Sequence, residues 1–250
     1  MRIVVVGGTG LVGAKVVDLL ASGGHDAVAA SPSTGVDTIT GAGLAEAMAG
    51  ADAVVDVSNS PVRDRALEFF TRSTRNQLAA EHTAGARHHV VLSIVGAERV
   101  PGNIHLAAKV AQEAEAEAGG VPWTILRATQ FFEFLSAIVE SSASGDTVRV
   151  PTAAMQPVAA ANVAATLAEL ALGAPRGRVE MGGPETLGID AWARRLLAAT
   201  GDERTVVGDP DAGYFGGQVA GDVMTTGPGA LIGTTDFDAW FAEQRRSAPR

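Results

Sequence analysis

The chain has 250 residues, of which 46% are hydrophobic and 19% are charged, and its mean hydropathy is +0.17. This length predicts one or two domains, and the composition is typical of a globular core rather than a disordered chain. The net charge of −9 provides no general attraction to phosphate backbones, so we expect no nucleic-acid partner. The apolar runs are too short for a membrane span or a signal peptide, which predicts a cytoplasmic protein without a membrane partner.

Metal and thiol chemistry are not expected. The chain contains no cysteine, which excludes disulfides, thiolate zinc sites and a cysteine nucleophile. Its five histidines form no His-x-x-x-His or Glu-x-x-His pair. The sequence therefore predicts no metal site.

Short apolar runs and helical patterns alternate in the first half of the chain. The apolar runs predict strands at 3–6, 26–30, 53–57, 88–95 and 123–126, and the periodic segments predict helices at 11–20, 44–49, 63–84, 107–118 and 131–139. Residues 90–95 are apolar without alternation, as expected for a strand buried on both faces. The predicted fold class is α/β, with a doubly wound parallel sheet.

The pattern loosens after about residue 145. Helices are expected at 158–172, 189–199 and 237–244, separated by proline-containing turns and by a glycine-rich stretch at 208–233. We therefore expect a first domain over 1–150. A smaller α+β subdomain over 151–250 would bind substrate, interleaved with the first domain rather than independent of it.

A glycine-rich turn links the first predicted strand to the first predicted helix. Residues 7–13 read GGTGLVG and contain Gly-x-Gly-x-x-Gly. Such a turn is tight, lets the backbone approach a pyrophosphate, and places the phosphates at a helix N-terminus. A βα turn without a ligand is the alternative, but the strand–turn–helix context favours dinucleotide binding. The residues expected to contact the dinucleotide are Gly7, Gly10, Leu11, Val12 and Gly13.

The choice of dinucleotide depends on the residues after the second strand. NAD-specific sites place Asp or Glu about 20 residues after the glycines, on the ribose 2′-hydroxyl. Here the strand is followed by Ser31, Ser33 and Thr34, whose hydroxyls either bind the ribose or form an ordinary Ser/Pro turn. Because no carboxylate repels a 2′-phosphate, the sequence favours NADP(H) over NAD(H).

Five segments together resemble the atypical short-chain dehydrogenase/reductase superfamily, in its NmrA-like branch. They are GGTGLVG at 7–13, GADAVVD at 50–56, VLS at 91–93, Lys109, and VPWTILR at 121–127. The resemblance implies a Rossmann fold that binds the cofactor across the carboxyl ends of the strands. It also implies that Asp37 meets the adenine and that Ser58 and Asn59 line the ribose and nicotinamide. Asp37 and Asn59 have an alternative role as turn formers.

The resemblance also implies the position of the catalytic groups. Hydride-transferring members carry a serine at the end of the fourth strand and a Tyr-x-x-x-Lys pair on the next helix, where the lysine lowers the phenol pKa from about 10 toward neutrality. This chain has Ser93 and Lys109, but His105 stands four residues before the lysine. Histidine is a competent acid/base, so His105 either replaces the tyrosine or marks the loss of ketone reduction. Lys109 is also expected to hold the ribose.

The substrate side is expected beyond the strand that ends near 126. Gln130 and Phe131 follow that strand, and Tyr214 lies in the glycine-rich stretch as a candidate lid residue. Two functions are consistent with these residues. One is an NAD(P)H-dependent oxidoreductase acting on a small carbonyl, enone or quinone; the other is an NmrA-like regulator that senses the dinucleotide without turnover. The sequence does not indicate an oligomeric state.

Overall fold

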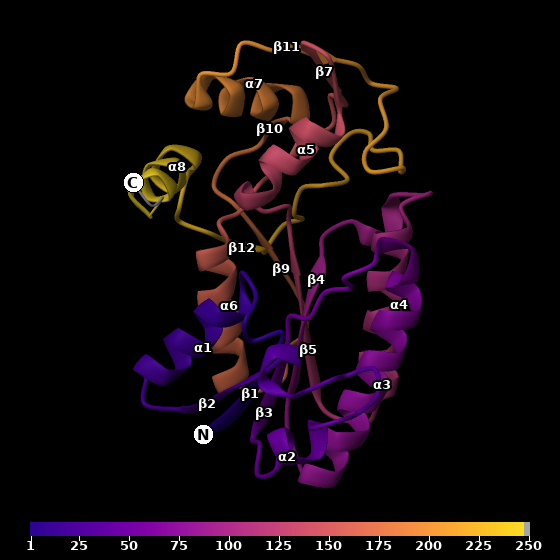
Figure 1. The fold of residues 1–250 in the computed structure, drawn as a ribbon, viewed down its shortest axis with the longest axis vertical. Helices are drawn as coiled ribbons and strands as arrows, with labels where there is room; N and C mark the ends of the chain where they lie inside the picture. The colour runs from indigo at the N-terminus through magenta and orange to yellow at the C-terminus, as the bar shows by residue number, and fades with distance from the viewer. Residues whose placement is uncertain (248–250) are drawn as a thin grey trace. The chain divides into compact units, whose positions relative to one another are not determined.

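The computed structural model describes residues 1–247. Its central sheet has seven strands in the order β12-β9-β5-β4-β3-β1-β2 (Figure 1). In chain order these are β1 (Arg2–Val6), β2 (Asp26–Ala30), β3 (Ala53–Asp56), β4 (His89–Ile94), β5 (Trp123–Ala128), β9 (Gly177–Gly182) and β12 (Leu231–Ile232). Strand β1 pairs in parallel with both β2 and β3, and β3 pairs in parallel with β4. The α/β fold class with a doubly wound parallel sheet is confirmed.

The chain forms two compact units, each drawn from several segments. The first unit comprises Met1–Ile94, Ile104–Arg127 and Val163–Val179. The second unit comprises Val95–Asn103, Ala128–Asn162 and the chain from Glu180 onward. The sequence places one boundary near residue 150 and predicts an interleaved second part. In the structure Val163–Val179 belongs to the first unit, whereas Val95–Asn103 and Ala128–Asn162 belong to the second.

The first unit sandwiches its strands between helices. These are α1 (Gly13–Ser22), α2 (Leu44–Met48), α3 (Ala66–Ala84), α4 (Ile104–Ala118) and most of α6 (Ala160–Leu172). In Figure 1, α3 and α4 lie on one side of the strands and α1 and α6 on the other. Residues of β1 and β3 are buried almost throughout, as expected for strands covered on both faces. None of the helices in the described part of the chain is long and apolar enough to cross a bilayer.

Two helix starts differ from the sequence expectation. The helix expected at 63–84 begins as a 3₁₀ turn over Arg63–Arg65 and becomes α-helical at Ala66. Helix α4 begins at Ile104, earlier than the expected residue 107. This earlier start brings His105 into the same helix as Lys109.

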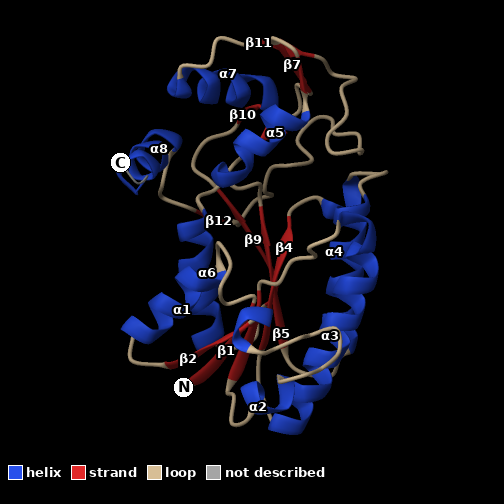
Figure 2. Cartoon of the chain, viewed as in Figure 1, coloured by secondary structure: helices blue, strands red, loops and turns tan. Residues whose placement is uncertain are grey.

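The second unit combines helices with short strands (Figure 2). Its helices are α5 (Leu135–Ser141), α7 (Ile189–Thr200) and α8 (Phe237–Ser247), and its short strands are β6 (Ala143–Ser144), β7 (Thr147–Val150), β8 (Ala154–Met155), β10 (Leu187–Gly188) and β11 (Thr205–Gly208). The aromatic rings of Phe132, Trp192, Phe237 and Trp240 pack together, with centroids 5.4–5.9 Å apart. The helices were expected at these places, but the positions of the strands were not, because segments of two to four residues carry little periodicity.

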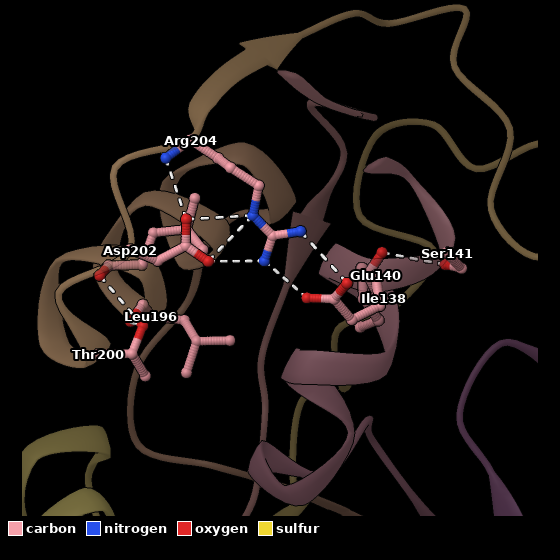
Figure 3. A network of polar contacts seen from close by, with 8 residues as sticks. Ile138, Glu140, Ser141, Leu196, Thr200, Asp202 and Arg204 are labelled. Carbon is pink, nitrogen blue, oxygen red and sulfur yellow. Dashed lines mark hydrogen bonds and ion pairs between the residues drawn. The ribbon is translucent and has the colours of Figure 1, made fainter. Parts of the chain in front are cut away.

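An arginine joins two elements at the surface of the second unit. The Arg204 guanidinium donates to the Asp202 carboxylate at 2.6 Å and to the Glu140 carboxylate of α5 at 2.6 Å (Figure 3). These two acceptors raise the pKa of Arg204 above its usual value, and the arginine lowers the pKa of both carboxyls. The contact ties the start of β11 to α5.

A buried ion pair joins α3 to β4 in the first unit. The Nδ1 atom of His89 lies 2.7 Å from the Glu81 carboxylate, and both side chains are completely buried. Burial opposes the imidazolium, but the charge and hydrogen bond of Glu81, with the more distant Asp56, outweigh burial and raise the pKa of His89. The pair therefore contributes stability while the imidazole is protonated.

Substitution of Glu81 by leucine should therefore cost more stability in mild acid than in base. Because the pKa of His89 is higher in the folded state, the ion pair stabilises the folded state fully when the pH is below the unfolded-state pKa of about 6.5. This stabilisation is lost as the pH rises through the folded-state pKa. We expect Glu81→Leu to lower the free energy of unfolding by about 3–5 kcal/mol at about pH 6, and by less at about pH 9. Urea denaturation at both pH values measures this difference.

The matched control is Glu115→Leu, which removes an ion pair with Arg75 between α3 and α4. The Arg75 side chain is 66% exposed, and exposed pairs contribute little. This variant should change the stability only slightly and equally at the two pH values. A cost for Glu81→Leu that does not depend on pH would contradict a charged His89.

Candidate functional site

The turn between β1 and α1 packs tightly against its neighbours. Gly7 has φ +80°, and a Cβ there would lie 2.9 Å from the backbone of Val57 and Ser58. A Cβ at Gly8 would lie 2.7 Å from the Val5 carbonyl oxygen, and one at Gly13 would lie 2.2 Å from the Gly7 carbonyl oxygen. The packing of the chain itself therefore requires glycine at these three positions.

Gly10 differs from the other glycines of the turn. A Cβ at Gly10 would have a single close neighbour, the Gly7 carbonyl oxygen at 3.3 Å, and the described chain leaves the rest of that space open. Helix α1 begins three residues later, at Gly13, without a side-chain cap and without an acidic residue in its first turn. The N–H groups of Leu11, Val12 and Gly13 donate to no acceptor within residues 1–247. An anionic group fits this helix terminus.

The hydroxyl groups after β2 are largely engaged in their own turn. Ser31 Oγ accepts from the Thr9 N–H at 3.3 Å, and Thr34 Oγ1 accepts from the Ser31 N–H at 2.9 Å. Ser33 is exposed, and its hydroxyl lies 3.4 Å from Thr9 Oγ1. This part of the chain forms a Ser/Pro turn beside the glycine turn, and roles for these residues at a ribose stay predictions.

Asp37 and Asn59 both make local turn contacts. The Asp37 carboxylate accepts from the N–H groups of Ile39 and Thr40 at 2.8 and 3.2 Å, and these two bonds hold its pKa below the usual value. The Asn59 side chain accepts from the Ser60 N–H at 3.0 Å. Neither contact tests the expected cofactor contacts of these two residues.

Two serines at the carboxyl ends of adjacent strands have buried hydroxyls without a partner. Ser93 lies in β4 and is 1% exposed, and Ser58 follows β3. Neither Oγ atom has a hydrogen-bond partner among the described residues. A buried hydroxyl left unpaired is costly, so both positions suit a bound polar group.

Lys109 is a buried cation on α4. The residue is 5% exposed, and its ammonium donates to the Leu92 carbonyl oxygen at 2.6 Å and to Gln112 Oε1. It also lies 4.5 Å from the centre of the Phe70 ring. Burial lowers its pKa to about 8, although Asp56 and Glu113 favour the charged form. Lys109 is thus still mostly protonated at neutral pH and can release a proton readily.

His105 lies one turn before Lys109 on the same helix. Its ring packs edge-on against Phe70 at 5.6 Å between centroids. Burial, followed by the charges of Lys109 and Arg63, lowers its pKa to about 4. At neutral pH the imidazole is therefore uncharged.

Two polar residues near Lys109, Asp56 and Gln112, were not predicted from the sequence as site residues. Asp56 Oδ2 accepts from Gln112 Nε2 at 2.8 Å and from Gln77 Nε2 at 3.0 Å, and Asp56 Oδ1 accepts from the Ser58 N–H at 2.9 Å. All three side chains are buried. The available signal was the spacing of Lys109 and Gln112, three residues apart on one helix face.

The expected substrate residues lie in the second unit. The Tyr214 hydroxyl donates to Gln130 Oε1 at 3.0 Å, and the Phe131 ring stacks on Phe134 at 5.5 Å. Burial raises the pKa of Tyr214 well above its usual value, so the phenol stays protonated. Tyr214 opens a tight turn in which Phe215 has φ 46°. The structure joins Tyr214 to Gln130, but it does not test their contact with a substrate.

Residues 1–247 contain no group of three or more His, Asp or Glu side chains that could hold a metal ion.

No protein-family model matches the chain, and no curated protein sequence matches it. Solved structures do share its fold. MoeE5 in complex with UDP-glucose and NAD has a TM-score of 0.78 at 16% identity, with 99% of each chain covered. The NADPH-dependent quinone oxidoreductase of Escherichia coli has a TM-score of 0.68 at 20% identity, covering 83% of this chain and 78% of that one. The triphenylmethane reductase of Citrobacter sp. has a TM-score of 0.63 at 21% identity, covering 85% and 80%.

The fold is also shared by a dTDP-4-dehydrorhamnose reductase of Bacillus anthracis in complex with NADP, with a TM-score of 0.68, and by a nucleoside-diphosphate-sugar epimerase of Staphylococcus aureus, with a TM-score of 0.66. At this level of identity they establish the architecture of the present chain. The resemblance to the NmrA-like branch of the short-chain dehydrogenase/reductase superfamily stays a prediction.

Proposed function

We propose that the chain binds a nicotinamide dinucleotide at the β1–α1 turn. The observation that carries this proposal is Gly10, the one glycine of the turn whose missing side chain leaves open space, at an uncapped helix terminus. Solved structures of the same fold contain NAD or NADP, which supports the proposal. Gly7 and the N–H groups of Leu11, Val12 and Gly13 would cradle the pyrophosphate.

The residues beyond the turn suit the rest of such a cofactor. The unpaired hydroxyls of Ser58 and Ser93 and the third N–H of Lys109 would serve its ribose and nicotinamide end. Asp37 and Asn59 would border the adenine and the ribose, respectively. We further propose NADP(H) over NAD(H), because Ser31, Ser33 and Thr34 bring no carboxylate to the end of β2.

The chemistry proposed for the chain is oxidoreduction of a small carbonyl, enone or quinone. A bound nicotinamide supplies the hydride. Lys109 supplies the proton. With a pKa of about 8 its ammonium is charged at neutral pH, and this pKa is close enough to neutral pH for efficient proton transfer. The Ser93 hydroxyl orients the reacting oxygen, and the uncharged His105 accepts or donates a hydrogen bond without carrying charge. Gln130, Phe131 and Tyr214 contact the substrate.

A dinucleotide-sensing regulator is the second candidate function. The observation that favours it is the replacement of the expected tyrosine by His105, whose pKa of about 4 makes it a weak base. The single tyrosine of the chain, Tyr214, belongs to the second unit. A regulator would bind the dinucleotide and consume none of it.

Valine in place of Gly10 should block dinucleotide binding and leave the fold intact. The side chain would fill the space that we assign to the pyrophosphate, so we expect the dissociation constant measured by calorimetry to rise about 100-fold or more, about 3 kcal/mol. The matched control is Gly173→Val, which follows α6 and whose Cβ would make ordinary contacts at 3.5 Å or more. Equal affinities for the wild type and Gly10→Val would refute this site.

NADPH should bind more tightly than NADH. No carboxylate follows β2 to repel the 2′-phosphate, and serine and threonine hydroxyls and N–H groups are compatible with it. Calorimetric titration of each reduced cofactor decides the preference. A lower dissociation constant for NADH would remove the proposed preference and leave the binding site itself standing.

Turnover should depend on the charge of Lys109. With a panel of quinones, enones and carbonyls, Lys109→Met should lower kcat by about 10²–10⁴-fold, whereas His105→Phe, which keeps the ring against Phe70, should lower it less than about tenfold. Reduction by the wild type should slow as the pH rises through about 8, because the ammonium is lost, and should show no inflection near 6.5. A larger loss for His105→Phe would transfer the proton role to His105. If wild type binds cofactor and consumes none, the regulator function is favoured.

A further inference from the structure

We infer that Asp56 and Gln112 are positioning residues that hold the Lys109 ammonium at the carboxyl end of β4, through a buried chain running from carboxylate to amide to ammonium. The inference depends on the proposed function only for what Lys109 does when cofactor and substrate are bound. The hydrogen bonds themselves all lie within the first unit and do not depend on the proposed function.

The hydrogen bonds from Asp56 through Gln112 to Lys109 form an unbroken series. Gln112 Oε1 accepts from the Lys109 ammonium, and Gln112 Nε2 donates to Asp56 Oδ2 at 2.8 Å. The ammonium then reaches the Leu92 carbonyl oxygen at 2.6 Å. Leu92 directly follows the last residue pair between β3 and β4, which joins Asp56 to Val91. Lys109 therefore binds the strand carbonyl at the position where pairing with β3 ends.

The two neighbours of Gln112 determine the orientation of its amide. A flipped amide would place its NH₂ group against the ammonium and its oxygen against the carboxylate, which replaces two attractions by two repulsions. Gln77 Nε2 donates to the same carboxylate oxygen at 3.0 Å and to Ser73 Oγ at 3.0 Å. The Asp56 carboxylate is therefore held from β3, α3 and α4 at once.

None of the other described groups around Lys109 takes the place of Gln112 as a side-chain hydrogen-bond acceptor. On α4, the Glu113 carboxylate is bound bidentately by Arg127 of β5 at 2.6 and 2.9 Å, and His105 is uncharged at neutral pH. From α3, Phe70 contributes a ring face. Arg63 acts on His105 as a positive charge. The Gln112 side chain is thus the side-chain hydrogen-bond acceptor of Lys109 within the described residues.

The composition of the chain allows a direct test. It contains only two lysines, Lys15 and Lys109, and Lys15 is exposed. Labelling lysine Cε with ¹³C gives two resonances, and Lys15→Arg assigns them. A pH titration of the full chain by NMR then measures the pKa of Lys109 with neither cofactor nor substrate present, and Lys15 serves as an internal reference.

The proposal predicts shifts of opposite sign for two substitutions of similar size at Gln112. Gln112→Met removes the acceptor and should lower the measured pKa of Lys109 by about one unit. Gln112→Glu places one carboxylate oxygen against the ammonium and the other against the Asp56 carboxylate, where the two carboxyls share a proton. Negative charge still moves next to the ammonium, so the pKa of Lys109 should rise by about one unit. Asp56→Asn removes the negative charge of the carboxylate that binds Gln112, and should lower the pKa of Lys109. The control Ser73→Ala removes a buried hydroxyl that contacts Gln77 and not Lys109, and should leave the value unchanged.

Each outcome decides the inference. Opposite shifts for Gln112→Met and Gln112→Glu support the positioning of Lys109 by Gln112. These two variants suffice if Asp56→Asn fails to fold. Unchanged values for both, or shifts of the same sign, overturn it. If the opposite shifts are found but the wild type binds no dinucleotide in calorimetry, the positioning of Lys109 by Gln112 stands and the proposed function fails.

Discussion

The carboxylate of Asp56 holds together the part of the first unit from which the candidate chemistry is built. It accepts three N–H groups, from the backbone of Ser58, from Gln77 on α3 and from Gln112 on α4. A buried carboxylate is stable only when donors surround it. These donors hold the end of β3 against α3 and α4. Gln112 in turn accepts a hydrogen bond from the Lys109 ammonium and so fixes its position.

The glycine turn shows two separate reasons for glycine at closely spaced positions. At Gly7, Gly8 and Gly13 a Cβ would collide with backbone atoms, so the fold alone accounts for them. At Gly10 the described chain leaves room, and the dinucleotide that we propose there would account for the absence of a side chain. A sequence motif does not separate these reasons, since all four positions carry the same residue.

Burial, more than pairing, determines the acid–base character of the candidate site. Desolvation lowers the pKa of Lys109 to about 8 and that of His105 to about 4, in each case as the largest cause. The two shifts assign different states at neutral pH, a mostly charged lysine and an uncharged imidazole. Lysine spacing alone could not assign these states, because the desolvation of a helix face depends on what packs over it, here Phe70 and the first turns of α3.

The amino-acid sequence by itself determined the alternation of strands and helices in the first unit, the position of the glycine turn, and the presence of Ser93, His105 and Lys109 on consecutive elements. These features follow from local periodicity and from residue types with restricted backbone geometry. Only the tertiary structure decided that Asp56 and Gln112 join Lys109, that the hydroxyls of Ser58 and Ser93 are buried without partners, and which segments belong to each unit. Asp56 and Gln112 are separated by 56 positions in the chain. Their contact is set by the packing of α4 against the sheet, which no local pattern encodes.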